Sequence, residues 1–172
     1  MPKKELILLL LMFTVIGCTN NVDQEQSKQM KTAMSSNFKS FIDQAWNKKD
    51  MDSLRLVADE GYVRRLNGIE VAININELEA NMNIFFMGFP DLEIRIDKSI
   101  IKDSLLFAKW TFKGTNTGVF GESPATGKSI VVHGFSELIF DTQGKIKKED
   151  VYYNELELLQ QLGYTLNPPI VE

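Results

Sequence analysis

The side chains that could transfer a proton gather near the C-terminal end of the sequence. Asp150 and Tyr152 alternate along the segment KIKKEDVYY, so both side chains point to one face if this segment is a strand. If that face is the inward one and is shared with Asn154, Asp150 is a candidate general acid or base inside an apolar cavity. The alternative is a solvated carboxylate near the rim of the sheet.

His133, the only histidine, is a further candidate for acid/base chemistry. It lies in the apolar segment VVHGF and shares a strand face with Phe135 and Glu137. With Tyr152, it would assist Asp150. The alternative is a structural histidine with its hydrogen bonds satisfied. Because the chain has one histidine and one cysteine, we predict no metal site, and we expect no cofactor.

Composition favours one compact domain. The chain has 172 residues, of which 44% are hydrophobic and 24% are charged, and this is enough to form a real core. Its net charge is −4, and no block of lysine or arginine interleaves with aromatic residues. Nucleic-acid binding needs such a basic footprint, so we do not expect it.

The N-terminal segment has the pattern of an export signal. Lys3 and Lys4 precede an apolar run, Leu6 to Ile16, that is too short to span a bilayer as a mature helix. The order Val15-Ile16-Gly17-Cys18 resembles the bacterial lipobox, which implies cleavage before Cys18 and acylation of that cysteine. We expect a signal peptide over residues 1–17, the lipidated cysteine and a tether over 18–28, and the folded domain over 29–172.

A lipidated Cys18 would attach the protein to a membrane surface without crossing it. The expected location is therefore the bacterial cell envelope. Thr19 follows the cysteine, at a position where an aspartate would argue for retention in the inner membrane. Outer-membrane attachment is therefore favoured.

Hydrophobic periodicity predicts three helices in the first half of the domain. Apolar residues recur every three or four positions from Met30 to Trp46, which indicates a long first helix. Asp50 can cap a short second helix. Asn74 followed by Glu77 resembles the capping box of a third helix.

Strand patterns dominate the second half of the domain. Residues 62–68 predict a first strand that ends in an Asn-Gly turn, and after Pro90 the period changes to two over four successive strands. Strands that follow one another without crossover helices cannot form a parallel doubly wound sheet. We predict an α+β fold in which a curved antiparallel sheet wraps over the three helices and encloses a cavity, whose mouth is the usual ligand site.

Five stretches of sequence, in order, resemble one family. They are WNKKDMDSL (46–54), FPDLEIRI (89–96), GTNTGVFGESPATGK (114–128), GKIKKE (144–149) and LLQQLG (158–163). Together they resemble the SnoaL-like polyketide and ester cyclases of the nuclear transport factor two-like superfamily. The resemblance implies a cone-shaped α+β barrel, commonly dimeric, with a hydrophobic pocket for a ring-bearing substrate.

Two positions depart from the pattern of that family. An aspartate shortly before LLxQLG is the general acid/base of the cyclases, and the matching residue here is Asn154. Asn116 stands in GTNTG where the family often has histidine. Amides do not transfer protons near neutral pH, so both are candidate ligand-binding residues instead. Asn154 is alternatively the N-cap of a short C-terminal helix, NELELLQQLG.

The aromatic residues supply the remaining ligand-binding candidates, which either fill the core or line the cone: Trp110, Tyr62, Phe86 and Phe135. The favoured function is that of an envelope lipoprotein that binds a small hydrophobic or ring-bearing molecule. One alternative is a cyclase- or isomerase-type enzyme that uses Asp150. The other is a non-catalytic structural or partner-binding module, including a homodimer.

Overall fold

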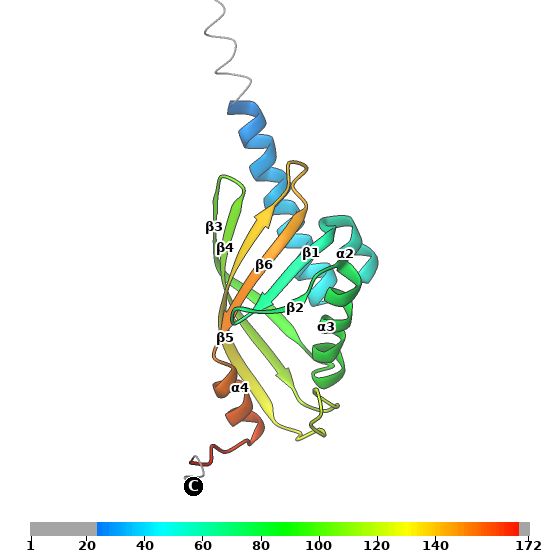
Figure 1. Ribbon diagram of the computed structural model, residues 1–172, viewed down its shortest axis with the longest axis vertical. Helices are drawn as coiled ribbons and strands as arrows, with labels where there is room; N and C mark the ends of the chain where they lie inside the picture. The colour runs from blue at the N-terminus through cyan, green and yellow to red at the C-terminus, as the bar shows by residue number, and fades with distance from the viewer. Residues whose placement is uncertain (1–23, 169–172) are drawn as a thin grey trace, which may run out of the picture.

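A computed structural model of the protein describes residues 24–168 (Figure 1). The predicted signal peptide and Cys18 lie outside the described residues. Residues 24–28, expected in the tether, are helical and exposed. Within residues 24–168, no helix combines the length and the apolar character needed to cross a bilayer.

The described part of the chain opens with a long helix, which is followed by three further helices and six strands. The first helix covers residues 24–40 and continues as the π-helical turn η1, Phe41–Trp46. The remaining elements are α2 Met51–Val57, β1 Ala58–Leu66, β2 Ile69–Ala72, α3 Ile75–Gly88, β3 Glu93–Lys102, β4 Leu105–Thr115, β5 Ser129–Phe140, β6 Ile146–Tyr153 and α4 Glu155–Leu162.

Local sequence signals explain where several elements begin and end. The Asp50 carboxylate accepts hydrogen bonds from the backbone N–H groups of Asp52 and Ser53, which starts α2 as predicted. The Asn74 side chain accepts from Glu77 N and thereby starts α3. The predicted Asn-Gly turn joins β1 to β2, because Asn67 (φ 50°) and Gly68 (φ 86°) both adopt the left-handed conformation that this turn requires.

The strands form one six-stranded sheet with the order β2-β1-β6-β5-β4-β3. The predicted α+β class is confirmed, and the sheet is curved but does not close into a barrel. The prediction of a purely antiparallel sheet is wrong at one place, since β1 and β6 pair in parallel. This pairing places the first and the last strand of the chain side by side.

The concave face of the sheet packs against the helices and forms the core. On β4, Leu106, Ala108 and Phe112 point inward, whereas the alternate side chains point to the outer face. The end of the first helix and α3 cover this inner face with fully buried side chains such as Phe41 and Leu78. Figure 1 shows the helices on one side of the sheet and α4 at the end of the sheet opposite the start of the first helix.

Candidate functional site

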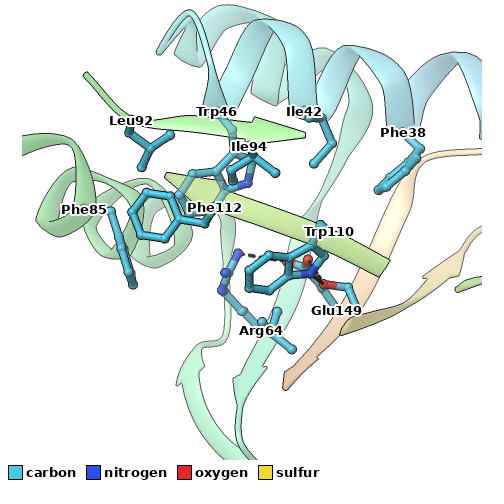
Figure 2. A pocket seen from close by; sticks show the side chains of 12 residues that line it. Phe38, Ile42, Trp46, Arg64, Phe85, Leu92, Ile94, Trp110, Phe112 and Glu149 are labelled. Carbon is cyan, nitrogen blue, oxygen red and sulfur yellow. Dashed lines mark hydrogen bonds and ion pairs between the residues drawn. The ribbon is translucent and has the colours of Figure 1, made fainter. Parts of the chain in front are cut away.

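The core contains a small cavity between the first helix, α3 and the inner face of the sheet (Figure 2). Its volume is about 50 Å³. The lining is mostly apolar and comprises Phe38, Ile42, Trp46, Arg64, Phe85, Leu92, Ile94, Trp110, Phe112, Ser136, Glu149 and Val151. Both tryptophans of the chain therefore lie in its wall.

An ion pair lies in the sheet wall of this cavity. Arg64 on β1 and Glu149 on β6 are direct partners across the parallel pairing, so their side chains emerge on the same face. Arg64 Nη1 donates to Glu149 Oε2 over 2.8 Å, and the two side chains are only 7% and 6% exposed. Figure 2 shows the pair on the sheet side of the cavity, across from the side chains of the first helix.

Three neighbouring side chains complete a hydrogen-bonded network around Glu149. The Tyr62 hydroxyl donates to Glu149 Oε2 over 2.8 Å, and the Ser136 hydroxyl donates to Oε1 over 3.0 Å. Trp110 Nε1 in turn donates to Ser136 Oγ over 3.0 Å. The carboxylate of Glu149 thus accepts three hydrogen bonds, which compensates much of the cost of its burial.

The Arg64 guanidinium has fewer of its hydrogen bonds satisfied than the Glu149 carboxylate. Its guanidinium carbon lies 5.0 Å from the centre of the Trp46 ring, a favourable cation–π contact. Its Nε is buried and has no hydrogen-bond partner within residues 24–168. An unsatisfied buried donor costs about 1–3 kcal/mol, so the burial of Arg64 is only partly compensated.

The network also changes the acidity of Tyr62. Burial raises the pKa of the Tyr62 hydroxyl well above its ordinary value, and the nearby charge of Glu149 raises it further. A second negative charge next to Glu149 is therefore strongly disfavoured at this point. Tyr62 stays a neutral hydrogen-bond donor at physiological pH.

The absence of a side chain at Gly134 leaves room for the Trp110 ring in the cavity wall. A Cβ atom at Gly134 would lie 2.1 Å from Cζ2 of the Trp110 ring. Gly134 is directly opposite Trp110 across the β4–β5 pairing. Glycine therefore lets the indole lie flat against the sheet, with Nε1 within reach of Ser136.

The three side chains predicted to be catalytic lie on the outer face of the sheet, away from the cavity. The predicted inward orientation of Asp150 is wrong: Glu149 faces the cavity, while Asp150 faces outward and pairs with Lys148 over 2.7 Å. The prediction took Asn154 as an inward strand residue, but β6 ends at Tyr153 and Asn154 begins α4. Tyr152 shares the outward orientation of Asp150 and is 49% exposed.

His133 belongs to a separate cluster on the outer face. Its Nδ1 lies 3.1 Å from Thr111 Oγ1, and this hydroxyl donates to Asp97 Oδ2 over 2.8 Å. Because the Thr111 hydroxyl has one proton and donates it to Asp97, Nδ1 of His133 is the donor in its hydrogen bond with Thr111 Oγ1. No hydrogen bond joins His133 to Asp150 or Tyr152 within the described residues, so the structure does not assemble the predicted acid/base set.

Of the predicted aromatic candidates, Trp110 lines the cavity and Tyr62 contributes its hydroxyl to the Glu149 network. Phe86 packs against Trp46, with ring centres 5.7 Å apart, but is outside the cavity lining. Phe135 is on the outer face, 41% exposed and stacked on Phe107. We call Phe107, Val131, Phe135 and Tyr152 the outer-face patch.

Both asparagines have structural partners. Asn116 is 1% exposed; its Nδ2 donates to the carbonyls of Gly88 and Gly118, and its Oδ1 accepts from the amide and the hydroxyl of Thr126. It therefore fixes the loop between β4 and β5. Asn154 accepts from Glu157 N over 3.1 Å, so the N-cap interpretation is confirmed. Neither residue lines the cavity.

Sequence reasoning missed Arg64, Glu149 and Ser136 as members of one site. The signal was present as Tyr62-Val63-Arg64, in which a charged residue shares a strand face with an aromatic one. Without the β1–β6 pairing, however, Arg64 and Glu149 look like two solvated charges far apart in the chain.

A surface groove adjoins the cavity on the side of edge strand β3. Its volume is about 440 Å³, and it lies between the first helix and β3. Phe38, Ile42 and Ile94 line both spaces, so these three side chains form the partition. Asn47 fixes one end of the groove, because its side chain bonds to both backbone groups of Ile94, at 2.9 and 2.7 Å.

Comparisons with known proteins point to one family. The family model of the SnoaL-like polyketide cyclases matches residues 36–162. No curated protein matches the chain.

Solved structures share the fold at low sequence identity. A SnoaL-like protein from Jannaschia sp. CCS1 is 18% identical with a TM-score of 0.71, over 80% of this chain and 94% of that one. TsrD from Streptomyces laurentii is 21% identical with a TM-score of 0.68, over 77% and 96% of the two chains. An LEH-like epoxide hydrolase from M. tuberculosis is 12% identical with a TM-score of 0.60, over 76% and 90%.

Proposed function

This chain belongs to the SnoaL-like polyketide cyclase family, and from that premise we propose that it binds a small hydrophobic or ring-bearing molecule in the cavity beside Arg64 and Glu149. The observation that carries the proposal is the buried ion pair. Removing two charges from water costs several kcal/mol for each ion, and apolar residues of similar volume usually stabilise a core at least as well. A charged pair in an otherwise apolar pocket is therefore best explained by recognition of a ligand.

The size of the cavity limits how such a molecule can be held. About 50 Å³ accommodates only a small group, so a ring needs the space beyond the partition. The groove beside β3 is about 440 Å³ and shares Phe38, Ile42 and Ile94 with the lining of the cavity. We propose that the polar end of the ligand lies in the cavity and that its body displaces the Ile94 side chain toward the groove.

Nuclear magnetic resonance tests this binding directly, because the indole N–H signals of Trp46 and Trp110 both report on the cavity wall. Titration with cyclohexanone should shift both signals saturably. The Arg64→Met/Glu149→Gln double variant should weaken the titration, whereas Phe135→Ala, on the outer face, should leave it unchanged. A wild-type protein without saturable shifts would contradict the proposal.

A second candidate function is catalytic, and it is favoured by the position of a carboxylate and a guanidinium side by side in the wall of an apolar cavity. In this version Glu149, rather than Asp150, would take a proton next to a carbonyl group, and Arg64 would donate a hydrogen bond to the resulting enolate oxygen. The test is exchange of the α-protons of cyclohexanone in heavy water. Enzyme-dependent exchange that Glu149→Gln abolishes would support catalysis, and absence of exchange would leave binding alone.

We further propose that the protein is anchored in the bacterial cell envelope through a lipid on Cys18. The basic start, the apolar run and the lipobox-like order Val15-Ile16-Gly17-Cys18 support this proposal. Mass spectrometry of the protein from membranes should find a cleaved, acylated Cys18. A mature chain that retains residues 1–17, or whose cysteine carries no lipid, would contradict it.

A homodimer is proposed through the outer-face patch. Phe135 and Tyr152 are cross-strand partners on the outer face and are 41% and 49% exposed, and exposed aromatic clusters favour association. Sedimentation equilibrium should give twice the monomer mass for the wild type and the monomer mass for Phe135→Ser. A monomeric wild type would contradict the proposal.

A further inference from the structure

The groove beside β3 has the backbone of a strand as one of its walls. β3 is the last strand at one edge of the sheet, so no further strand covers the outer side of its backbone (Figure 1). Four consecutive residues of this strand, 93–96, line the groove. Consecutive side chains of a strand point to opposite faces, so all four border one groove because the edge of the strand itself faces it.

One residue of this edge is already paired, by a side chain rather than by a strand. Asn47 Nδ2 donates to the carbonyl oxygen of Ile94 over 2.9 Å, and the N–H of Ile94 donates to Asn47 Oδ1 over 2.7 Å. These are the two hydrogen bonds that a residue of a neighbouring strand would exchange with Ile94. The amide of Asn47 therefore occupies the place of a strand residue at this edge.

The next position along the edge is open. In an antiparallel pair, consecutive residues direct their N–H and C=O groups alternately toward the partner strand and away from it. Ile94 directs both groups to Asn47, so Ile96, two residues on, also directs its pair away from β4. Within residues 24–168, no backbone group outside the sheet bonds to Ile96. Such an unpaired edge is a template for another chain, and it ends after Ile96, where the register of β3 shifts.

Apolar side chains cover the inner side of this edge. Phe38 and Ile42 of the first helix line the groove together with Ile94 and Ile96. Residues directly opposite each other on paired strands point to the same face. The residues of an added strand that lie opposite Ile94 and Ile96 would therefore meet an apolar surface.

Charges of alternate sign follow the outer side of the same edge. Glu93 and Arg95 are both exposed. Arg95 pairs with Asp97 over 2.8 Å, whereas Glu93 forms no ion pair within the described residues. Opposite charges directly across two strands stabilise the pairing, and like charges weaken it. An added strand is therefore favoured by a basic residue opposite Glu93 and an acidic residue opposite Arg95.

We propose that the edge of β3 beside the first helix is a docking site for an extended segment of a partner protein. The segment pairs as an added antiparallel strand, exchanges both backbone hydrogen bonds with Ile96 and takes over Ile94 from Asn47. Its inward residues are apolar, and its outward residues are acidic opposite Arg95 and basic opposite Glu93. Backbone bonds supply the affinity and the alternate side chains the specificity. This inference does not rest on the ligand proposed for the cavity.

The peptide acetyl-Val-Glu-Val-Lys-amide has this pattern and serves as the probe. In the antiparallel direction its first valine lies opposite Ile96 and its second opposite Ile94. Titration should shift the backbone N–H signals of Ile94 and Ile96 saturably. N-methylation of the first valine removes an N–H that points to β3, so the affinity should fall about tenfold. N-methylation of the glutamate removes an N–H that points to solvent, so this control peptide should bind like the parent peptide.

A matched pair of variants tests the role of Asn47. Asn47→Ala removes the side chain that competes for Ile94, so the affinity for the peptide should rise about tenfold. Asn37→Ala is the same substitution on the same helix, where the side chain donates to the carbonyl oxygen of Gly144, and it should leave the affinity unchanged. An unchanged or lower affinity of Asn47→Ala would show that Asn47 does not hold the place of a strand. If Asn47→Ala does not fold, the two methylated peptides decide the question.

The outcomes distinguish this inference from the function proposed for the cavity. Equal affinity for the parent peptide and both methylated peptides would overturn pairing with the edge of β3. Absence of saturable shifts at Ile94 and Ile96 would overturn the docking site, while binding in the cavity would stand. If the same signals shift with protein concentration in the absence of peptide, the edge binds a second copy of the chain, and the proposal of a separate partner is overturned.

Discussion

The buried pair of Arg64 and Glu149 makes a quantitative prediction about stability. Glu149→Gln keeps the shape and the acceptor oxygen for Tyr62 but leaves the charge of Arg64 uncompensated in a site where its side chain is 7% exposed. Arg64→Met leaves the carboxylate without its cation. Breaking one side of a buried pair costs about 3–5 kcal/mol, so each single variant should lose roughly that much free energy of unfolding.

The double variant Arg64→Met/Glu149→Gln should behave differently. It removes both charges, keeps an acceptor oxygen for the Tyr62 hydroxyl and removes the unsatisfied Nε. Its free energy of unfolding should therefore lie within about 1–2 kcal/mol of the wild type, which makes the coupling between the two sites at least about 4 kcal/mol.

Urea unfolding followed by tryptophan emission gives the free energy of unfolding of all four proteins. The values can be compared if the free energy falls with urea concentration at a similar slope in each protein. If the losses of the single variants simply add, so that the double variant is about as unstable as their sum, the two charges do not interact as described. In that case the retention of the pair no longer supports a role in binding.

Three further predictions follow from the structure. Because the pKa of Tyr62 is raised in the folded state, its contribution to stability is complete below the ordinary value of 10.0 and is lost as the pH rises from there toward the folded pKa. Tyr62→Phe should therefore flatten the decline in the free energy of unfolding above about pH 10, and an unchanged decline would contradict this. Asn154→Ala should lower the free energy of unfolding by about 1 kcal/mol, because the N-cap of α4 is lost. Asn154→Asp keeps a capping oxygen, so it should change stability little and leave ligand affinity unaltered. A change in affinity in Asn154→Asp would show that Asn154 is more than a cap. Ile94→Ala should join the cavity to the groove and thereby raise the quenching of tryptophan emission by acrylamide. Ile96 lines only the groove, so the control variant Ile96→Ala should leave the quenching unchanged. Equal quenching in the two variants would show that Ile94 does not separate the two spaces.

Short-range patterns in the sequence predicted much of the architecture. The caps at Asp50, Asn74 and Asn154 and the turn at Asn67-Gly68 depend on residues within three positions of each other, and the structure has them as predicted. The change from helical to strand periodicity also placed the α+β class correctly.

The site itself depends on contacts that no local pattern contains. Arg64 and Glu149 are separated by 85 residues and meet only because β1 pairs in parallel with β6. The orientation of β6 was predicted from Asn154, which lies beyond the end of the strand and carries no information about its faces. One step of error in the alternation of a strand exchanges its two faces, so Asp150 was placed where Glu149 lies.

The most direct test of the central claim is the map of chemical-shift changes over the whole protein when cyclohexanone is added. The account predicts saturable changes at the indole N–H groups of Trp46 and Trp110 and along β1 and β6 around Arg64 and Glu149. Changes confined to the outer-face patch, or changes at the cavity that persist undiminished in Arg64→Met/Glu149→Gln, would show that the buried pair is not the binding site.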